Sequence, residues 1–498
     1  MKIFKLTMAI LISAVIIFLT AFLFSSCNNK SNPENSQPDS SGANQTDVAE
    51  ETKNLNDWRN YLDKEDYGGY EFRILTRDSA DHIAEIYSES ENGEAVNDAV
   101  FRRNSNIEDA FNIKIVPVLG SETDSAGITN MVKNSVLSGG NDYDFVVNHM
   151  VWAGNGAAKG YYYNWAEVPY VQMDKPWWSK NAYDNVSIKG KSYLAAGDIS
   201  YAGIGFTMIL TFNKDILSRF GLEDPYVLVK NGGWTMQKFG EMVRSVTQDV
   251  NGDQVYDAND LFGLFMAGGG PKLAFQFGAG QHITKKDENG YPVLDMIGEA
   301  AVSVFDFYYD LYHTGTYTLY YQDNHPNEAN SFEVFSGGHS LFYCIQMNTL
   351  ISLRTMEGNF GVLPYPKYDA SQEKYNSIVN GHGPLMFIPN SAPDINRTGK
   401  ILEAMAIESH NLVIPAYVDL TMKTKMARDE ESAEMINYIM DGTVYDFGYV
   451  YDETGISYLI PSLMDAKNKA FVSEYEKMAG PTEKFYQKVI KQYESIAG

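Results

Sequence analysis

The stretch Tyr70-Glu71-Phe72-Arg73-Ile74-Leu75 alternates apolar and polar residues, the pattern of a strand with one buried face. The stretch Ile113-Lys114-Ile115-Val116-Pro117-Val118 repeats it, and Tyr143-Asp144-Phe145-Val146-Val147 is a short apolar run suited to a buried parallel strand. Residues 93–111 and 124–137 lie between these strands and read as helices. Strand, helix, strand, helix, strand predicts a parallel α/β sheet.

Beyond this unit the chain is long enough to form a second one. Its 498 residues are 44% hydrophobic and 21% charged, which suits a globular protein with a large core. After a glycine turn at residues 188–191, further helices are predicted at residues 235–246, 300–313 and 400–409. The length favours two or three units, which large α/β proteins often interleave.

Four later segments form an ordered set of motifs. They are residues 189–195 (Lys-Gly-Lys-Ser-Tyr-Leu-Ala) followed by 210–217, residues 224–226 (Asp-Pro-Tyr) with 233–239, residues 335–342, and residues 361–366 (Gly-Val-Leu-Pro-Tyr-Pro). In this order they resemble segments of the family 1 extracellular solute-binding proteins, and together they cover most of residues 65–450. The resemblance implies an α/β, two-lobe periplasmic-binding-protein fold (type II), with hinge strands and a central ligand cleft.

The resemblance also implies a division of the chain into two lobes. We expect lobe one to comprise residues 65–200 and 336–380, and lobe two to comprise residues 201–335 and 381–498. The tail after about residue 450 lies outside the matching motifs.

The first residues have the pattern of a secretory signal. Lys2 and Lys5 precede an apolar run from Leu6 to Phe24, and small residues lead directly to Cys27. A cysteine in this place resembles the lipobox of bacterial lipoproteins, in which the thiol is lipidated, so residues 1–27 are expected to be a lipoprotein signal peptide. The alternative is an uncleaved transmembrane anchor, because the run approaches the ~20 residues that span a bilayer. Both alternatives place the rest of the chain at the extracellular face of the cell membrane.

The segment after the signal is polar. From Asn28 to about Asn54 it consists mainly of Asn, Ser, Pro, Asp, Gln, Gly and Thr, which cannot form a core. Residues 28–64 are therefore expected to be a flexible tether.

Charge and cysteine content restrict the partners. Lys and Arg total 39 against 64 Asp and Glu, a net charge of −25, which argues against nucleic acid and favours a neutral or cationic ligand. The two cysteines, Cys27 and Cys344, cannot form a disulfide framework or a four-ligand zinc site.

Ligand-binding candidates come from strand ends, because ligands of α/β sheets lie beyond the carboxyl ends of strands. The first strand is followed by Thr76, Arg77 and Asp78, and the third by Asn148, His149 and Trp152. The family resemblance adds residues 268–277, with Phe275 among them, and also Gln346 and His382. Residues 152–201 are rich in Trp and Tyr, whose flat faces suit sugar rings, although most of these aromatics are expected in the core.

One acidic segment has the spacing of a calcium loop. Loop positions one, three, five, seven, nine and twelve are occupied by Asp249, Asn251, Asp253, Val255 (through its carbonyl), Asp257 and Asp260. Two departures are Gln254, where glycine is usual, and Asp260, where the longer Glu is usual. The segment therefore predicts a structural Ca²⁺ site, the alternative being a solvated acidic turn without metal.

Together these features predict a non-catalytic binding protein. The sequence lacks a phosphate-binding loop, a two-histidine zinc motif and a nucleophile-elbow serine, and no catalytic cofactor is expected. The resemblance implies the lipid-anchored, monomeric binding component of an ABC importer, with a sugar or oligosaccharide as ligand and membrane permease subunits as partners. The alternatives are a secreted glycoside hydrolase, since 64 acidic residues leave room for a catalytic pair, a binder of peptides or other solutes, and an all-helical polysaccharide-capture lipoprotein, which the strands disfavour.

Overall fold

The first predicted strand becomes β1 (Tyr70–Arg77), the centre of a four-stranded sheet in lobe one. β1 pairs in parallel with β2 (Ile113–Gly120) and β3 (Phe145–His149), and β12 (Pro384–Phe387) pairs antiparallel with β3. The order is β12-β3-β1-β2. The three strands predicted between residues 70 and 147 are confirmed in this computed structural model, which describes residues 57–121, 125–320 and 329–495.

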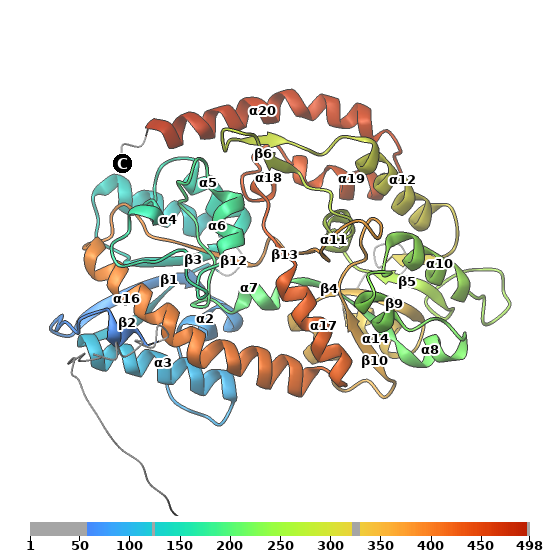
Figure 1. Ribbon diagram of the computed structural model, residues 1–498, viewed down its shortest axis with the longest axis horizontal. Helices are drawn as coiled ribbons and strands as arrows, with labels where there is room; N and C mark the ends of the chain where they lie inside the picture. Colours follow the sequence, from blue (N-terminus) through green and yellow to red (C-terminus); the bar gives the residue numbers. More distant parts are fainter. Residues whose placement is uncertain (1–56, 122–124, 321–328, 496–498) are drawn as a thin grey trace, which may run out of the picture. The chain divides into compact units, whose positions relative to one another are not determined.

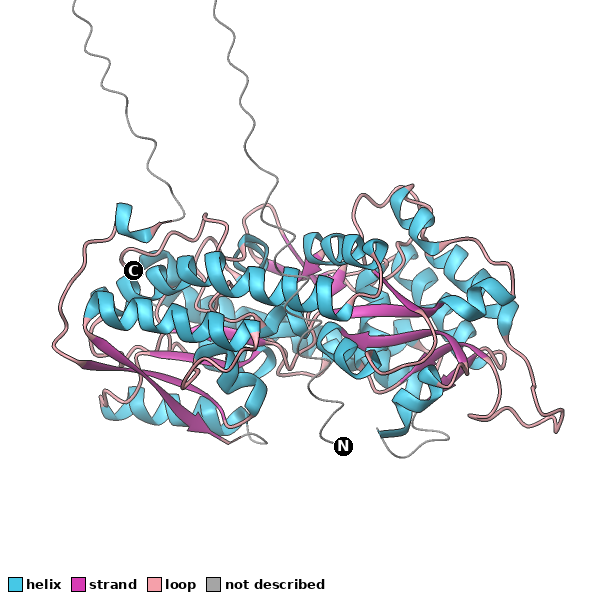
Figure 2. Cartoon of the chain, turned by 90° about the horizontal axis from the view of Figure 1, so that it is seen from below, coloured by secondary structure: helices cyan, strands magenta, loops and turns pink. Residues whose placement is uncertain are grey.

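A five-stranded sheet forms lobe two. Its order is β10 (Phe360–Leu363), β4 (Met208–Asn213), β9 (Ser340–Gln346), β5 (Phe262–Met266) and β8 (Thr318–Tyr320). β5 lies between β9 and β8 and is parallel to both, whereas β4 is antiparallel to both of its neighbours. Figure 1 shows the two sheets side by side, and Figure 2 shows helices along the faces of each.

Helices cover both sheets. Around the first sheet are α2 (Ala80–Ile86), α3 (Ala95–Phe111), α4 (Ser125–Ser138), α5 (Met150–Ala157), α6 (Lys180–Val186) and α16 (Ile395–Glu408). The second sheet and the chain around it contain α7 (Ala202–Gly205), α8 (Lys214–Arg219), α9 (Pro225–Lys230), α10 (Met236–Val246), α11 (Gly270–Gly278), α12 (Glu299–His313), α14 (Ala329–Ser336), α15 (Leu350–Leu353) and α17 (Glu430–Asp441). The helices predicted near residues 93–111, 124–137, 235–246, 300–313 and 400–409 are thus all present.

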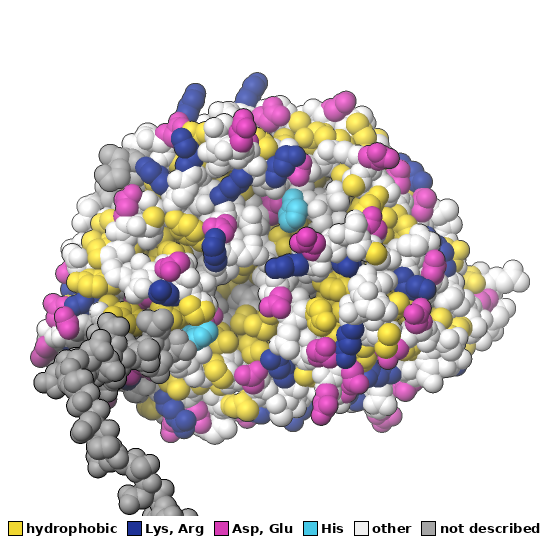
Figure 3. Space-filling view, viewed as in Figure 1, with side chains coloured by type: hydrophobic (Ala, Val, Ile, Leu, Met, Phe, Trp, Pro, Cys, Tyr) yellow, Lys and Arg dark blue, Asp and Glu magenta, His cyan; other side chains and the backbone are white. Residues whose placement is uncertain are grey.

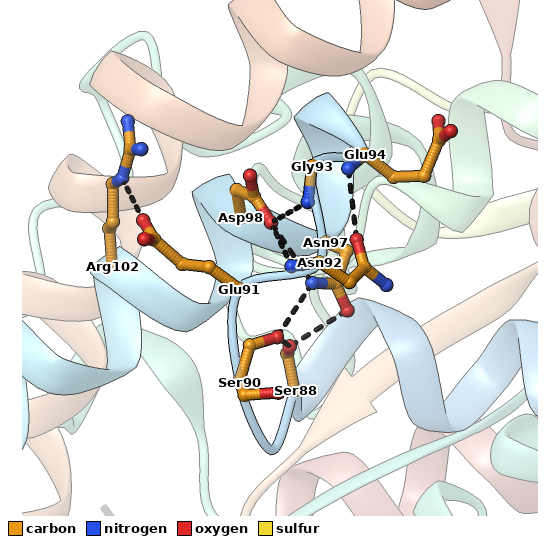
Figure 4. Close-up of polar contacts among 9 residues, drawn as sticks. All are labelled: Ser88, Ser90, Glu91, Asn92, Gly93, Glu94, Asn97, Asp98 and Arg102. Atoms are coloured by element: carbon orange, nitrogen blue, oxygen red, sulfur yellow. Dashed lines mark hydrogen bonds and ion pairs between the residues drawn. The ribbon is translucent and has the colours of Figure 1, made fainter.

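The start of α3 shows how local polar contacts fix a helix end. The Asp98 carboxylate in its first turn accepts hydrogen bonds from the backbone N–H of Asn92 (2.8 Å) and Gly93 (3.3 Å). Asn92 in turn accepts from the Glu94 N–H at 2.9 Å, as Figure 4 shows. These contacts satisfy amides just before the helix, and the hydrogen bonds from Asn92 and Gly93 lower the pKa of Asp98.

The predicted lobe boundaries after residue 335 are wrong. Residues 336–380 were assigned to lobe one, but β9 and β10 lie in the lobe-two sheet. Residues after 381 were assigned to lobe two, but β12 completes the lobe-one sheet. β9 pairs with β4 and β5, and β10 pairs with β4, so this part of the chain stays in lobe two. The chain returns to lobe one only after residue 378, where β12 pairs with β3.

Two extended crossings and one helix connect the lobes. The Asn380 N–H donates to the Phe206 carbonyl at 2.9 Å, and Thr207 pairs with Val379 between the sheets. Beyond α16, the helix continues without a break through the π-helical segments η4 (Ser409–Val413) and η5 (Ala416–Met426) into contact with α17. The hinge thus consists of two adjacent extended segments and one long helix.

The C-terminal segment packs over the lobes. It comprises α18 (Phe447–Val450), η6 (Ile456–Tyr458), α19 (Leu459–Asp465) and α20 (Phe471–Ser495). Figure 1 shows α20 running above the paired strands β6 (Thr284–Lys286) and β7 (Pro292–Leu294). It contacts α12 and α19 on the lobe-two side, and near its end Tyr493 packs against Tyr193 of lobe one.

The segment before β1 is ordered. Trp58, in η1 (Trp58–Asn60), is fully buried, and its indole N–H donates to Glu408 at 2.9 Å. Leu62 is buried in the same core. The prediction that the tether extends to residue 64 is therefore wrong for residues 57–64, because these apolar side chains pack on lobe one. The rest of the tether and Cys27 lie outside the described residues. In the described ranges, every helix is too short or too polar to cross a membrane.

Candidate ligand-binding cleft

The carboxyl ends of strands from both sheets meet beside the hinge. β1 ends at Arg77, β3 at His149, β5 at Met266 and β9 at Gln346. A cavity of about 660 Å³ lies there, a size suited to a small organic ligand. Its lining consists of Met208, Ala267, Gly268, Gly269, Gly270, Pro271, Phe332, Tyr343, Cys344, Ile345, Gln346, Thr349, Ser352, Leu353, Asn380 and His382.

The lobe-two wall is formed by backbone, amide and hydroxyl groups. A glycine turn between β5 and α11 begins at Gly268, whose φ of 72° favours glycine. A Cβ on Gly270 would lie 2.9 Å from the Asn380 side-chain nitrogen, so glycine allows the turn to approach the hinge. Gln346, Thr349 and Ser352 add polar side chains, and none of the described residues that line the cavity is Asp or Glu.

On the opposite side His382 lines the cavity, and next to it lies a cluster of one arginine and two further histidines. Arg77 Nη1 lies 2.7 Å from His82 Nε2 and also contacts His149 Nε2. His382 lines the cavity and packs edge-on against His149, with 4.7 Å between ring centroids. We call Arg77, His82, His149 and His382 the Arg–His cluster.

The hydrogen bonds of the Arg–His cluster define its protonation. A guanidinium only donates, so the Nε2 atoms that face Arg77 must accept, which leaves His82 and His149 as neutral Nδ1–H tautomers. Burial, then Arg77, then His382 and His82, lower the pKa of His149 to about 2. Burial, Arg77 and His82 also lower the pKa of His382. The lowered pKa values of His149 and His382 favour the neutral forms of these two side chains.

A second set of buried groups supports this wall from behind. His82 Nδ1 lies 3.2 Å from the Glu85 carboxylate, which also accepts from the Ser200 hydroxyl. Arg103 is fully buried and donates to the carbonyls of Glu85 (3.2 Å) and Ile86 (3.1 Å) at the end of α2. The helix α2, which carries His82, is thus held by the hydrogen bonds of its Glu85 side chain and by the bonds of Arg103 to its last carbonyls.

The structure brings some predicted site residues together and separates others. Gln346 and His382 line the cavity, His149 packs against His382, and Arg77 contacts His149. Thr76 and Asn148 are 0% and 1% exposed, so they lie beneath the cleft surface. Asp78 is exposed, and Trp152 is 40% exposed on α5.

Phe275 does not line the cavity and is a correction to the predicted site. It is 0% exposed and packs against the rings of Phe239, Tyr308 and Tyr365 at 5.1, 4.6 and 4.8 Å between centroids. The reason is that α11 begins at Gly270, so only its first two residues, Gly270 and Pro271, line the cavity.

Several residues were not among the predicted ones: Asn380, Thr349 and Ser352 line the cavity, and His82 contacts Arg77. Sequence signals point to His82 and Asn380. His82 is the third residue of the helix that follows β1, as Trp152 is the third residue of the helix that follows β3. Asn380 precedes His382 in the Asn-Gly-His-Gly crossing, and its side-chain oxygen accepts from the His382 N–H at 3.0 Å.

The aromatic segment from residue 152 to 201 serves mainly as core, as expected. Trp165, Trp177 and Trp178 are at most 3% exposed. The indole N–H groups of Trp177 and Trp178 donate to the buried Glu403 at 3.0 and 2.9 Å. Burial raises the pKa of that carboxyl group.

The predicted calcium loop is a series of turns in lobe two. Asp249 accepts from the N–H of Gly252 (2.7 Å) and Gln254 (2.9 Å), and Asp260 accepts from the Val250 N–H (2.8 Å). Gln254 has a φ of 64°, the left-handed conformation that glycine usually adopts at this loop position. In the described part of the chain, no three His, Cys, Asp or Glu side chains are grouped to hold a metal. The Ca²⁺ site therefore stays a prediction.

Solved structures share this architecture. The chain matches an ABC substrate-binding protein from Listeria monocytogenes in complex with cycloalternan, at 10% identity, with 85% of this chain and 99% of that chain covered and a TM-score of 0.52. It matches the galacto-N-biose/lacto-N-biose I-binding protein from Bifidobacterium longum at 13% identity, 85% and 99% coverage and a TM-score of 0.58.

A third match is UgpB from Mycobacterium tuberculosis in complex with glycerophosphocholine, at 13% identity, 86% and 100% coverage and a TM-score of 0.54. No protein-family model and no curated protein matches the chain. At these identities the likeness concerns the fold, and the predicted α/β architecture is confirmed. The chain has the two-lobe periplasmic-binding-protein fold.

Proposed function

We propose that the protein is the substrate-binding component of an ABC importer that captures a sugar or oligosaccharide by lobe closure and without catalysis. The observation that carries this proposal is the cavity beside the hinge, which has polar groups of lobe two on one side and His382, with the rest of the Arg–His cluster next to it, on the other. The fold neighbours include binders of cycloalternan and lacto-N-biose, which supports a saccharide ligand. We propose that the protein is a monomer and that its partners are the saccharide ligand and the membrane permease subunits.

Closure follows from the placement of the contacts. A ligand in the cavity touches groups that belong to lobe two, while Arg77 and His149 belong to lobe one. A ligand that contacts both walls binds the closed form more tightly, and this difference in affinity shifts the equilibrium towards closure. The closed form is the one that we propose the permease recognises.

A thermal-shift screen of saccharides and peptides tests the proposed function. A ligand at one hundred times its dissociation constant stabilises the native state by about 2.7 kcal/mol. We expect a saccharide to raise the melting temperature and to be recovered unchanged. Stabilisation by peptides alone would contradict the sugar ligand, and consumption of the saccharide would show a glycoside hydrolase instead.

We further propose that the protein is lipid-anchored through Cys27 at the extracellular face of the membrane. The support is the charged start, apolar run and small residues before Cys27. Replacing Cys27 with serine should abolish lipidation, because only the thiol accepts the lipid, and the precursor should keep its signal peptide if processing requires that lipid. Mass spectrometry of the membrane-bound native protein checks this: an unmodified Cys27 would favour the transmembrane anchor.

We also propose that residues 249–260 bind a structural Ca²⁺, on the basis of their ligand spacing and the left-handed Gln254. Ca²⁺ should raise the melting temperature of the unmutated protein, and Asp253→Ala should remove most of that rise by deleting a ligand oxygen. The matched control is Asp369→Ala, which removes an exposed turn-capping carboxylate outside the loop. Equal melting temperatures of the unmutated protein in Ca²⁺ and in chelator would show a turn without metal.

A further inference from the structure

We propose that the ligand is a neutral polyhydroxyl compound, one of whose hydroxyl groups donates a hydrogen bond to Nε2 of His382 in the cavity beside the hinge. Asn380 is the positioning residue, because it fixes the imidazole in the form that leaves Nε2 as an acceptor. This inference rests on the proposed function and narrows the class of ligand. Both residues line the cavity.

The backbone of the hinge crossing determines how the Asn380 side chain is oriented. The backbone N–H of His382 donates to Oδ1 of Asn380 at 3.0 Å. A reversed amide would place its own N–H groups against this N–H, so that two donors would face each other. The atom nearest His382 is therefore the amide oxygen, which only accepts hydrogen bonds.

This oxygen in turn determines the tautomer of His382. Nδ1 of the imidazole lies 2.8 Å from Oδ1 of Asn380, a hydrogen-bond distance. Because an amide oxygen only accepts, Nδ1 must carry the proton. In a neutral imidazole the other nitrogen is then an acceptor, so Nε2 presents a lone pair.

The surroundings of His382 favour its neutral form. Burial, then Arg77 and His82, lower the pKa of its imidazole. The ring of His149, which packs edge-on against that of His382, also has a lowered pKa, of about 2, and is neutral. Asn380, the hydrogen-bond partner, carries no charge. Nε2 of His382 is therefore unprotonated at neutral pH.

A ligand can reach this acceptor. His382 lines the cavity and is exposed, although its ring packs on one side against His149. Among the residues that the structure describes, the only hydrogen-bond partner of the His382 side chain is Asn380. Nε2 is therefore available to a hydrogen-bond donor of the ligand.

The same amide places a donor in the cavity. Nδ2 of Asn380 lies 3.9 Å from Sδ of Met208, and a thioether sulfur is only a weak acceptor. Its N–H groups can therefore donate to a ligand oxygen while His382 accepts from a ligand hydroxyl. A compound with neighbouring hydroxyl groups offers both a donor and an acceptor, which is the pattern of a saccharide ring.

The lining of the cavity favours a hydroxyl over an ammonium as the group bound at His382. The described lining residues include no Asp or Glu, so a ligand cation would lack a carboxylate partner there. Figure 3 shows acidic side chains interspersed with basic ones over the face viewed, so the acidic excess of the chain is not gathered in one patch. Gln346, Thr349 and Ser352 both donate and accept, as ligand hydroxyl groups require.

Nitrogen NMR of the free protein tests the tautomer. The chain contains eight histidines, so histidine-selective ¹⁵N labelling of the full chain gives few signals, and His382→Asn identifies those of His382. We expect the neutral Nδ1–H form, and Asn380→Ala should remove this preference. A proton on Nε2 of the unmutated protein at neutral pH would reject the inference and leave the proposed importer intact.

Calorimetry tests the hydroxyl contact with neutral saccharides. The probes are trimers of glucose, galactose and mannose, and analogues of the trimer that binds in which fluorine replaces one hydroxyl group at a time. Fluorine cannot donate, so one analogue should bind about 3- to 10-fold more weakly, the value of one hydrogen bond. His382→Asn can still donate to Asn380 but does not reach the position of Nε2. In this variant the trimer and that analogue should bind equally.

Two further variants separate the acceptor from the general effect of replacing a histidine. His382→Gln can place its amide oxygen near the position of Nε2 and should keep part of the preference for the unmodified trimer. His339→Asn is the matched control, because Nδ1 of His339 lies 3.2 Å from the Asp260 carbonyl, beside the end of β9 opposite the cavity. It should leave the affinity unchanged. Melting temperatures show that each variant is folded.

The outcomes that contradict this inference differ from those that contradict the proposed function. If every fluorinated analogue binds as tightly as the unmodified trimer, or if the loss persists in folded His382→Asn, the contact at His382 is rejected and the importer stands. Tighter binding of the cationic glucosamine trimer than of the glucose trimer would reject the neutral ligand. If no trimer binds, the saccharide function itself is rejected.

Discussion

Replacing Arg103 with methionine is expected to lower the free energy of unfolding by about 3–5 kcal/mol. The guanidinium is fully buried and donates to the Ile199 carbonyl (3.2 Å) and the Ser409 hydroxyl (3.2 Å), and to the last carbonyls of α2. Burial lowers the pKa of Arg103 to about 10, and its charge is also near Glu85. Methionine fills much of the volume but leaves several buried acceptors without donors. Urea unfolding measures the loss.

Arg102 provides the matched control, because it is the neighbouring arginine on the same helix. Its guanidinium pairs with Glu91 at 2.5 Å, and the two side chains are 62% and 45% exposed (Figure 4). Such a surface pair contributes less than about 1 kcal/mol, so Arg102→Met should be nearly neutral. Equal losses for Arg102→Met and Arg103→Met would contradict the role assigned to Arg103.

The Arg103 network has a consequence for the cleft. It fixes the end of α2, and α2 carries His82, which orients Arg77. Arg103→Lys keeps the positive charge but reaches fewer acceptors, so it should fold with a smaller loss. In that variant we expect weaker ligand binding, while the positions of the lobe-two residues that line the cavity change little. The buried Arg103 thus helps to position α2 and His82.

The strands of lobe one could be predicted because their pattern is local. β1 and β2 alternate buried and exposed side chains over their first residues, and β3 is buried throughout. A general rule of α/β sheets made Arg77 and His149, at the ends of these strands, candidates for the site, and His149 packs against His382 of the cavity lining. Both residues belong to the Arg–His cluster.

The lobe boundaries could not be predicted in the same way, because they depend on distant pairing. Nothing in the local sequence of β9 reveals that it inserts between β4 and β5, or that β12 pairs with β3. The resemblance placed residues 268–277 correctly only as far as Pro271, since the start of α11 determines which side chains face inward. Phe275 points into the core for that reason.

Composition gives little information about the cleft for a similar reason. Net charge sums over the whole surface, whereas recognition depends on groups within a few ångströms of the ligand. The net charge of −25 favours a neutral or cationic ligand, and this stays a prediction. The positions of His82 and Asn380 in the sequence make them candidates, but their contacts with Arg77 and His382 depend on tertiary packing.

Replacing Tyr493 with alanine is expected to cost about 3–5 kcal/mol of stability and to release the end of α20 from lobe one. The Tyr493 ring is 1% exposed and lies edge-on to Tyr193, with 4.6 Å between ring centroids. Its hydroxyl contacts that of Tyr451, and its carbonyl accepts from Lys191 at 3.4 Å. Urea unfolding measures the loss, and hydrogen exchange of the α20 backbone amides reports the release.

The control is Tyr493→Phe, which keeps the aromatic contact and removes only the hydroxyl. It should cost about 1 kcal/mol, the value of one hydrogen bond, and leave α20 protected. If both variants lose the same stability, the hydroxyl pair rather than ring packing holds the helix. If neither increases exchange in α20, the helix is held by its lobe-two contacts with α12 and α19, and lobe one moves independently of it.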